Sequence, residues 1–126
     1  MSLAVGSPVY LHMDLQTDIS SRWEDLERKL QLRFGKKPDM ETILFLIGIQ
    51  ELGGPKQKFT KEEKQDLMHI AVCSLFMQSG YYEIEGYDTH QWPHFRQLKP
   101  LPEMGTAEQE NFLKDHILLY FSNNDF

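Results

Sequence analysis

Apolar residues recur at helical spacing over most of this chain, and one stretch alternates instead with the two-residue period of a β-strand. Residues 81–99 carry that alternation, interrupted by the turn-like segment 89–93. The flanking spacing is helical, with three apolar-periodic segments before this stretch and one after it. The sequence therefore predicts a mainly α (α+β) fold: four helices, with a β-hairpin between helices 3 and 4.

Capping residues and helix breakers predict where these helices begin and end. The first is expected to run from Asp18 or Ser20 to Gly35, and the second from Pro38-Asp39 to Gly53-Gly54-Pro55. The third is expected to begin at the capping box of Thr60 and Glu63 and to end at Ser79-Gly80. The fourth is expected to begin at the capping box of Thr106 and Gln109. Residues 1–17 show no sustained period. We therefore expect an N-terminal arm over 1–17 and a single helical domain over 18–126.

The strand-like stretch also predicts which side chains share a face of the hairpin. Period-two alternation places Tyr81, Glu83, Glu85 and Tyr87 on one face, and Tyr82 and Ile84 on the other. Pairing Tyr87 with His94 sets the register of the two strands. Glu85 then lies opposite Arg96, which is a favourable cross-strand charge pair.

The composition is that of an ordinary globular protein and argues against several other classes of chain. Apolar residues make up 40% of the 126 residues and charged residues 25%, which argues against general disorder. No apolar run approaches the roughly 18 residues of a membrane helix, and the N-terminus lacks the features of a signal peptide. A single cysteine, Cys73, excludes an intramolecular disulfide. We therefore expect a cytoplasmic protein without a membrane segment.

The charge distribution argues against nucleic acid as the partner. The net charge is −6, although residues 28–64 form a mildly basic stripe. Three helices followed by a hairpin is the order of a winged helix. The third helix is nevertheless apolar where a recognition helix needs polar base-reading groups, and the hairpin is acidic. A winged-helix-like nucleic-acid-binding domain is therefore the alternative rather than the leading interpretation.

Parts of the chain resemble a set of short bacterial helical proteins with no assigned activity. The resemblance rests on the segments 41–53 and 59–70, and on the hairpin pieces 80–83 and 92–94, within a similarity that covers roughly 15–122. It implies a cytoplasmic bacterial protein. Because no activity comes with the resemblance, no functional residue can be transferred from it.

The sequence contains no familiar catalytic or phosphate-binding motif, so we expect neither a catalytic residue nor a cofactor. The best candidate metal ligands are Asp88, His90 and His94, since two imidazoles and a carboxylate suit zinc or iron(II). Pro93 prevents the helix that would align the two histidines, and no fourth ligand is evident. We therefore expect solvated turn residues here rather than a metal site.

Other polar residues favour structural roles. His69 and Cys73 are four residues apart on one helix and share its face. Their neighbours are apolar, which predicts a core cysteine beside a hydrogen-bonded histidine rather than a nucleophile. We expect the same structural role for His116.

Aromatic residues are densest in the hairpin region, at Tyr81, Tyr82, Tyr87, Trp92 and Phe95. A two-stranded hairpin on a small helical body leaves part of its surface open, and tyrosine and tryptophan are typical interface anchors. The same rings could instead pack one hairpin face onto helices 3 and 4. We predict a non-enzymatic protein-interaction module with a protein partner or self-association, whose surface comprises Tyr81, Tyr87, Trp92 and Phe95. Small-molecule or metal binding in a hairpin–helix cleft is the third possibility.

Overall fold

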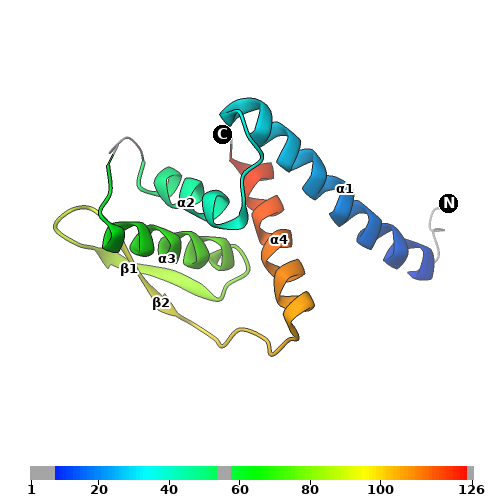
Figure 1. Cartoon of the computed structure of the whole chain (residues 1–126). Helices are drawn as coiled ribbons and strands as arrows, with labels where there is room; N and C mark the ends of the chain where they lie inside the picture. Colours follow the sequence, from blue (N-terminus) through cyan, green and yellow to red (C-terminus); the bar gives the residue numbers. More distant parts are fainter. Residues whose placement is uncertain (1–7, 54–57, 125–126) are drawn as a thin grey trace. The chain divides into compact units, whose positions relative to one another are not determined.

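The computed structural model describes the backbone of residues 8–53 and 58–124, and side chains from residue 19 onward (Figure 1). The described chain forms four helices and one two-stranded antiparallel sheet between the third and fourth helices. The predicted fold class is therefore confirmed. By backbone contacts the chain divides into an N-terminal unit, 1–37, and a C-terminal unit, 38–126. Within the described residues, no helix has the length and apolar character needed to cross a membrane.

The N-terminal unit contains one long helix, α1 (Pro8–Phe34). It begins well before Asp18 or Ser20, so the predicted start is wrong. Proline fits the first turn of a helix because its fixed φ suits that position and its missing N–H has no helical partner there. The expected apolar stripe is present and supplies the buried residues of α1, namely Trp23, Leu26 and Leu30. The helix ends as predicted at Gly35, whose φ of +88° favours glycine. Residues 1–7 of the predicted arm lie outside the described residues.

The C-terminal unit begins with α2 (Met40–Glu51) and α3 (Lys61–Met77). α2 starts directly after the predicted Pro38-Asp39 pair, with Asp39 as its N-cap, and α3 starts at the predicted capping box. The Asp39 carboxylate accepts a hydrogen bond from the Thr42 N–H at 2.9 Å. The Thr60 hydroxyl accepts one from the Glu63 N–H at 3.1 Å, and the Glu63 carboxylate accepts one from the Thr60 N–H at 2.9 Å. These side chains satisfy backbone donors that each helix leaves unpaired at its first turn.

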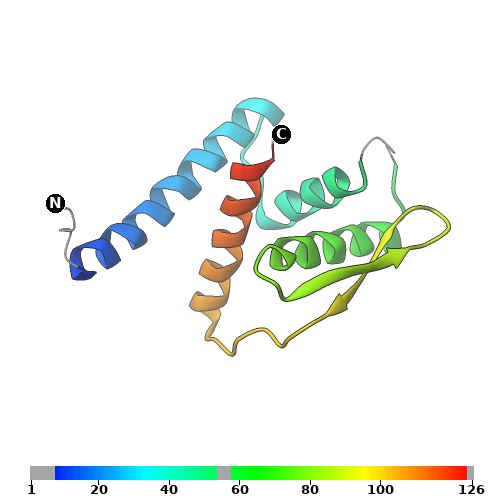
Figure 2. The same cartoon turned by 180° about the vertical axis from the view of Figure 1, so that it is seen from behind.

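α2 and α3 lie side by side in very close contact (Figures 1 and 2). Gly48 of α2 faces the backbone of α3, and a Cβ atom there would lie 2.4 Å from the carbonyl oxygen of Leu67. Ile47 and Leu67 are completely buried in this interface. The absence of a side chain at position 48 therefore allows the two helix backbones to approach.

The hairpin pairs β1 (Tyr82–Tyr87) with β2 (Pro93–Gln97) on the opposite side of α3 from α2 (Figure 2). The predicted register is wrong. Tyr87 pairs with Pro93 and Gly86 pairs with His94, because a β-bulge between Ile84 and Gly86 adds one unpaired residue. The expected charge pair does form, but its acid is Glu83, which lies opposite Arg96 and makes an ion pair with it.

The bulge also changes which side chains share a face of the hairpin. Cross-strand partners point to the same side, so the pairs Ile84–Phe95 and Tyr87–Pro93 lie on one face of the sheet. Tyr82 belongs to this face too. It lies beside α3, where burial and, secondarily, the neighbouring Cys73 raise its pKa. The predicted separation of Tyr87 from Tyr82 and Ile84 is therefore wrong.

The last helix, α4 (Thr106–Asn123), packs against α3, and its N-cap is Gly105. The predicted capping box at Thr106 and Gln109 is wrong by one position. Glu108 instead accepts a hydrogen bond from the Gly105 N–H at 3.1 Å. Farther along, the buried Tyr120 donates a hydrogen bond from its hydroxyl to the Glu51 carboxylate of α2 at 2.6 Å. This bond ties the end of α4 to the end of α2.

Candidate functional site

The aromatic residues proposed from sequence as an interaction surface separate into different environments. Tyr81 lies just before β1, and its ring packs edge-on against Phe76 at 6.3 Å and Phe112 at 6.0 Å between centroids. Lys99 places its ammonium group 4.5 Å from the centre of the same ring. Tyr81 therefore contributes to a ring cluster between α3 and α4 rather than standing free at the hairpin surface.

Farther along the hairpin, large apolar side chains reach solvent. Tyr87 is 61% exposed and Ile84 is 38% exposed, while Trp92 and Phe95 are half-buried. Ile84 was not among the residues predicted for the surface. Ile84 keeps the face predicted for it, with Tyr82, whereas the β-bulge at Glu85 brings Tyr87 to that face and leaves no clear pattern in the sequence.

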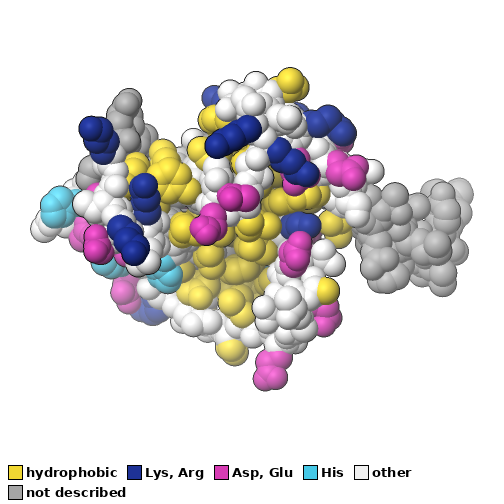
Figure 3. All heavy atoms as spheres, viewed as in Figure 1, with side chains coloured by type: hydrophobic (Ala, Val, Ile, Leu, Met, Phe, Trp, Pro, Cys, Tyr) yellow, Lys and Arg dark blue, Asp and Glu magenta, His cyan; other side chains and the backbone are white. Residues whose placement is uncertain are grey.

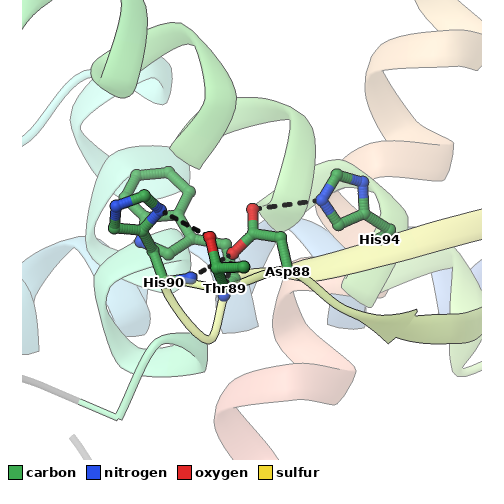
Figure 4. Close-up of polar contacts among 5 residues, drawn as sticks. Asp88, Thr89, His90 and His94 are labelled. Carbon is green, nitrogen blue, oxygen red and sulfur yellow. Dashed lines mark hydrogen bonds and ion pairs between the residues drawn. The ribbon is translucent and has the colours of Figure 1, made fainter.

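The hairpin loop is organised by the carboxylate of Asp88. One oxygen accepts hydrogen bonds from the backbone N–H groups of His90 at 2.9 Å and Trp92 at 3.1 Å. The other lies 3.1 Å from Nε2 of His94, and Figure 4 shows these two side chains directed at each other. The bond from the Trp92 N–H contributes most to lowering the pKa of Asp88, followed by the bond from His94. Asp88 therefore holds the loop that presents Trp92.

The three candidate metal ligands are only partly brought together. Asp88 and His94 are in contact, whereas the His90 ring has its Nδ1 3.4 Å from the Thr89 hydroxyl (Figure 4). Within the described part of the chain, no group of three or more histidine, cysteine or carboxylate side chains has an arrangement that could hold a metal ion. The Asp88 carboxylate instead makes protein hydrogen bonds with both oxygens.

A two-lobed depression lies between the hairpin and the first turns of α3, and we call it the hairpin pocket. One lobe has a volume of about 390 Å³ and the other about 200 Å³. The lobes share Asp66 of α3 with Asp88 and Trp92 of the hairpin. Figure 3 shows histidine, acidic and basic side chains interspersed at the end of the molecule that carries the hairpin loop. Sequence reasoning named the hairpin half of this pocket and missed the half from α3.

The polar residues of the helices have the structural roles expected of them. Cys73 is completely buried, its sulfur lies 3.6 Å from Nε2 of His69, and burial raises its pKa to about 11. A thiol with that pKa is protonated at neutral pH and is a poor nucleophile. His116 is buried, with ring nitrogens bonded to the Phe112 carbonyl at 2.7 Å and the Ser79 hydroxyl at 2.8 Å. Both predictions are confirmed.

Comparison with known proteins identified no relative of this chain. No family model matches the chain, and neither a curated protein nor a solved structure matches it. The functional argument therefore rests on the residues of this chain.

Proposed function

We propose that this protein is a non-enzymatic protein-interaction module that binds its partner through the outer part of the hairpin. The observation that carries the proposal is the exposure of Ile84 and Tyr87, 38% and 61%, on the same face of the sheet. We call these two residues the hairpin patch. A large aromatic side chain beside an aliphatic one, both in water, is typical of a surface that a partner covers.

The geometry of the hairpin explains why the patch stays open within the chain. The apolar face of the sheet packs on α3, which half-buries Tyr82 and Phe95. The patch residues belong to β1 and are more exposed than Tyr82 and Phe95. The bulge places Tyr87 on the apolar face of the sheet, with Ile84, instead of on the charged face. The opposite face carries the Glu83–Arg96 ion pair. The charged pair makes that face less suited to apolar contacts than the face that carries the hairpin patch.

The winged-helix alternative has less support from the same contacts. α3 uses Leu67, Ile70, Cys73 and Phe76 for the core, and its first turn carries two acids and two lysines, so it has no excess of positive charge. A recognition helix needs polar groups that reach the major groove, together with positive charge near phosphates. The position of the wing is occupied by a hairpin whose arginine, Arg96, is paired with Glu83.

A bait experiment with matched variants tests the proposal. The wild-type chain, an Ile84→Ser/Tyr87→Ser variant and a Leu119→Ser variant would each be immobilised in an extract of the source cells. Leu119 is the control because it is 39% exposed, as Ile84 is, but lies on α4. We expect a captured protein, or a second copy of the chain, to be lost from the hairpin variant and kept by the control.

Self-association is measured separately by sedimentation velocity over a range of concentrations. Circular dichroism and thermal unfolding must show that the hairpin variant is folded. A wild-type chain that stays monomeric, and captures nothing that the hairpin variant fails to capture, would contradict the proposed function.

A further inference from the structure

The hairpin pocket lies at the same end of the hairpin as Tyr87 and is built from two elements. Glu63, Asp66 and His69 of α3 line it on one side, and Asp88, Trp92 and His94 of the hairpin line it on the other. The larger lobe has a volume of about 390 Å³, enough for a side chain of a bound protein to enter it. This volume falls in the usual range for ligand pockets, roughly 300–1,000 Å³.

The chemistry of the walls defines the kind of group that fits. Three carboxylates, from Glu63, Asp66 and Asp88, line the larger lobe, and among its described lining residues there is no lysine or arginine. Trp92 lines both lobes. The smaller lobe adds the apolar side chains of Ile70 and Phe95. Acidic groups beside an indole ring favour a cation that can lie against an aromatic face.

The carboxylates differ in how far the protein itself already uses them. Asp88 accepts bonds from the Trp92 N–H and from His94, so it positions the indole ring and keeps its own charge. Glu63 takes part in the capping box of α3. Asp66 is exposed and makes no ion pair or hydrogen bond to the residues that the structure describes. Asp66 is therefore the carboxylate best placed to pair with an incoming cation.

We propose that the hairpin pocket binds the guanidinium group of an arginine side chain on the partner protein. This inference rests on the proposed function, because the arginine enters beside the hairpin patch as part of the same partner segment. Arginine is preferred to lysine since its planar guanidinium stacks on an aromatic ring, is more weakly hydrated than an ammonium group, and can donate two hydrogen bonds to one carboxylate.

A titration with a small probe tests the pocket without knowledge of the partner. Nα-acetyl-arginine N-methylamide would be added to ¹⁵N-labelled protein, with the citrulline analogue as the neutral isostere. The chain has two tryptophans, so the indole N–H of Trp23, which lines neither lobe, is an internal control. We expect saturable shifts of the Trp92 indole and of the amides around Asp66 with arginine, and none with citrulline.

Charge-neutralising variants then locate the carboxylate. Asp66→Asn is expected to weaken arginine binding by about two- to fivefold, the range for one partly exposed ion pair. Glu62→Gln is the matched control, because Glu62 is also an exposed acid of α3 but does not line the pocket. It should leave the affinity unchanged. Added salt should weaken binding to the wild-type protein.

The inference is overturned if citrulline or the lysine analogue produces the same Trp92 shifts as arginine, or if arginine produces none. It is also overturned if Asp66→Asn and Glu62→Gln have equal effects. The proposed function fails in a different way, through capture or self-association that does not depend on Ile84 and Tyr87. If the hairpin patch is required for association while arginine does not bind, only the pocket assignment is wrong.

Discussion

The two sides of α3 differ sharply in how they are covered. Toward α2, Leu67 is completely buried and lies against Gly48 with no room for one additional carbon atom. Toward the hairpin, the cover is partial and the contact region contains the open hairpin pocket. Close packing gives stability because every lost contact leaves a void, whereas an open, mixed surface contributes little to folding and stays available to a ligand. One helix therefore separates a closely packed side from a partly open side, and the proposed function assigns binding to the open side.

The largest effect should follow from a cavity on the α2 side. Leu67→Ala removes a completely buried side chain and is expected to lower the free energy of unfolding by about 2–5 kcal/mol. Urea denaturation followed by circular dichroism measures this change. Leu119→Ala, at a position 39% exposed, should cost much less, and equal losses for the two variants would show that this interface is not tightly packed.

A single added methyl group should break the same interface from the other helix. Alanine is a better helix former than glycine by about 1 kcal/mol. At position 48 that gain is outweighed, since the new Cβ would lie 2.4 Å from the Leu67 carbonyl oxygen and push the helices apart. We expect a net loss of about 1–3 kcal/mol in Gly48→Ala.

The matched control for that variant is Gly86→Ala in β1. A Cβ at Gly86 meets nothing within 4 Å, so the substitution should leave the unfolding midpoint close to that of the wild type. A stabilising effect of Gly48→Ala would contradict the close helix approach.

The bond between Tyr120 and Glu51 should have a smaller effect. Tyr120→Phe removes one hydrogen bond to an exposed carboxylate, so we expect a loss of about 1 kcal/mol in urea denaturation. Burial, followed by the bond to Glu51, raises the pKa of Tyr120. A raised pKa means that this stability is present below the unfolded pKa of about 10 and declines as the pH rises above it. The wild type should therefore lose more stability than Tyr120→Phe at strongly alkaline pH, and identical pH profiles would contradict this assignment.

Local signals in the sequence were sufficient for part of the fold. The Pro38-Asp39 pair and the capping box at Thr60 predicted the starts of α2 and α3, since each of these signals lies at or beside the first turn of its helix. The start of α4 was missed by one residue because the neighbouring residues Glu108 and Gln109 are both suitable for a capping box, and Glu108 fills that role. The start of α1 was missed because Asp18 can be accommodated inside a helix as well as at its end.

The candidate site was predictable only in its local part. Asp88 and His94 were named as candidate ligands and expected to be solvated turn residues; the structure brings their side chains into contact. The contribution of Asp66 depends on how α3 packs against the hairpin, which no local pattern encodes. The placement of Tyr87 on the same face as Ile84 depends on a bulge that shifts the strand register. Such features arise from contacts between elements, so they became visible only in the folded chain.

Substitutions in the hairpin patch should change the stability least. They test most directly whether the two sides of α3 have different roles. Ile84→Ser/Tyr87→Ser should unfold within about 0.5 kcal/mol of the wild type for each substitution, since both side chains are exposed. The decisive measurement is the association of this folded variant, by capture from extract and by sedimentation velocity, beside Leu119→Ser. We predict that the hairpin variant loses association and that the control keeps it. Strong destabilisation together with unchanged association would show that the hairpin side of α3 belongs to the core, and would contradict the separation of a binding side from a stabilising one.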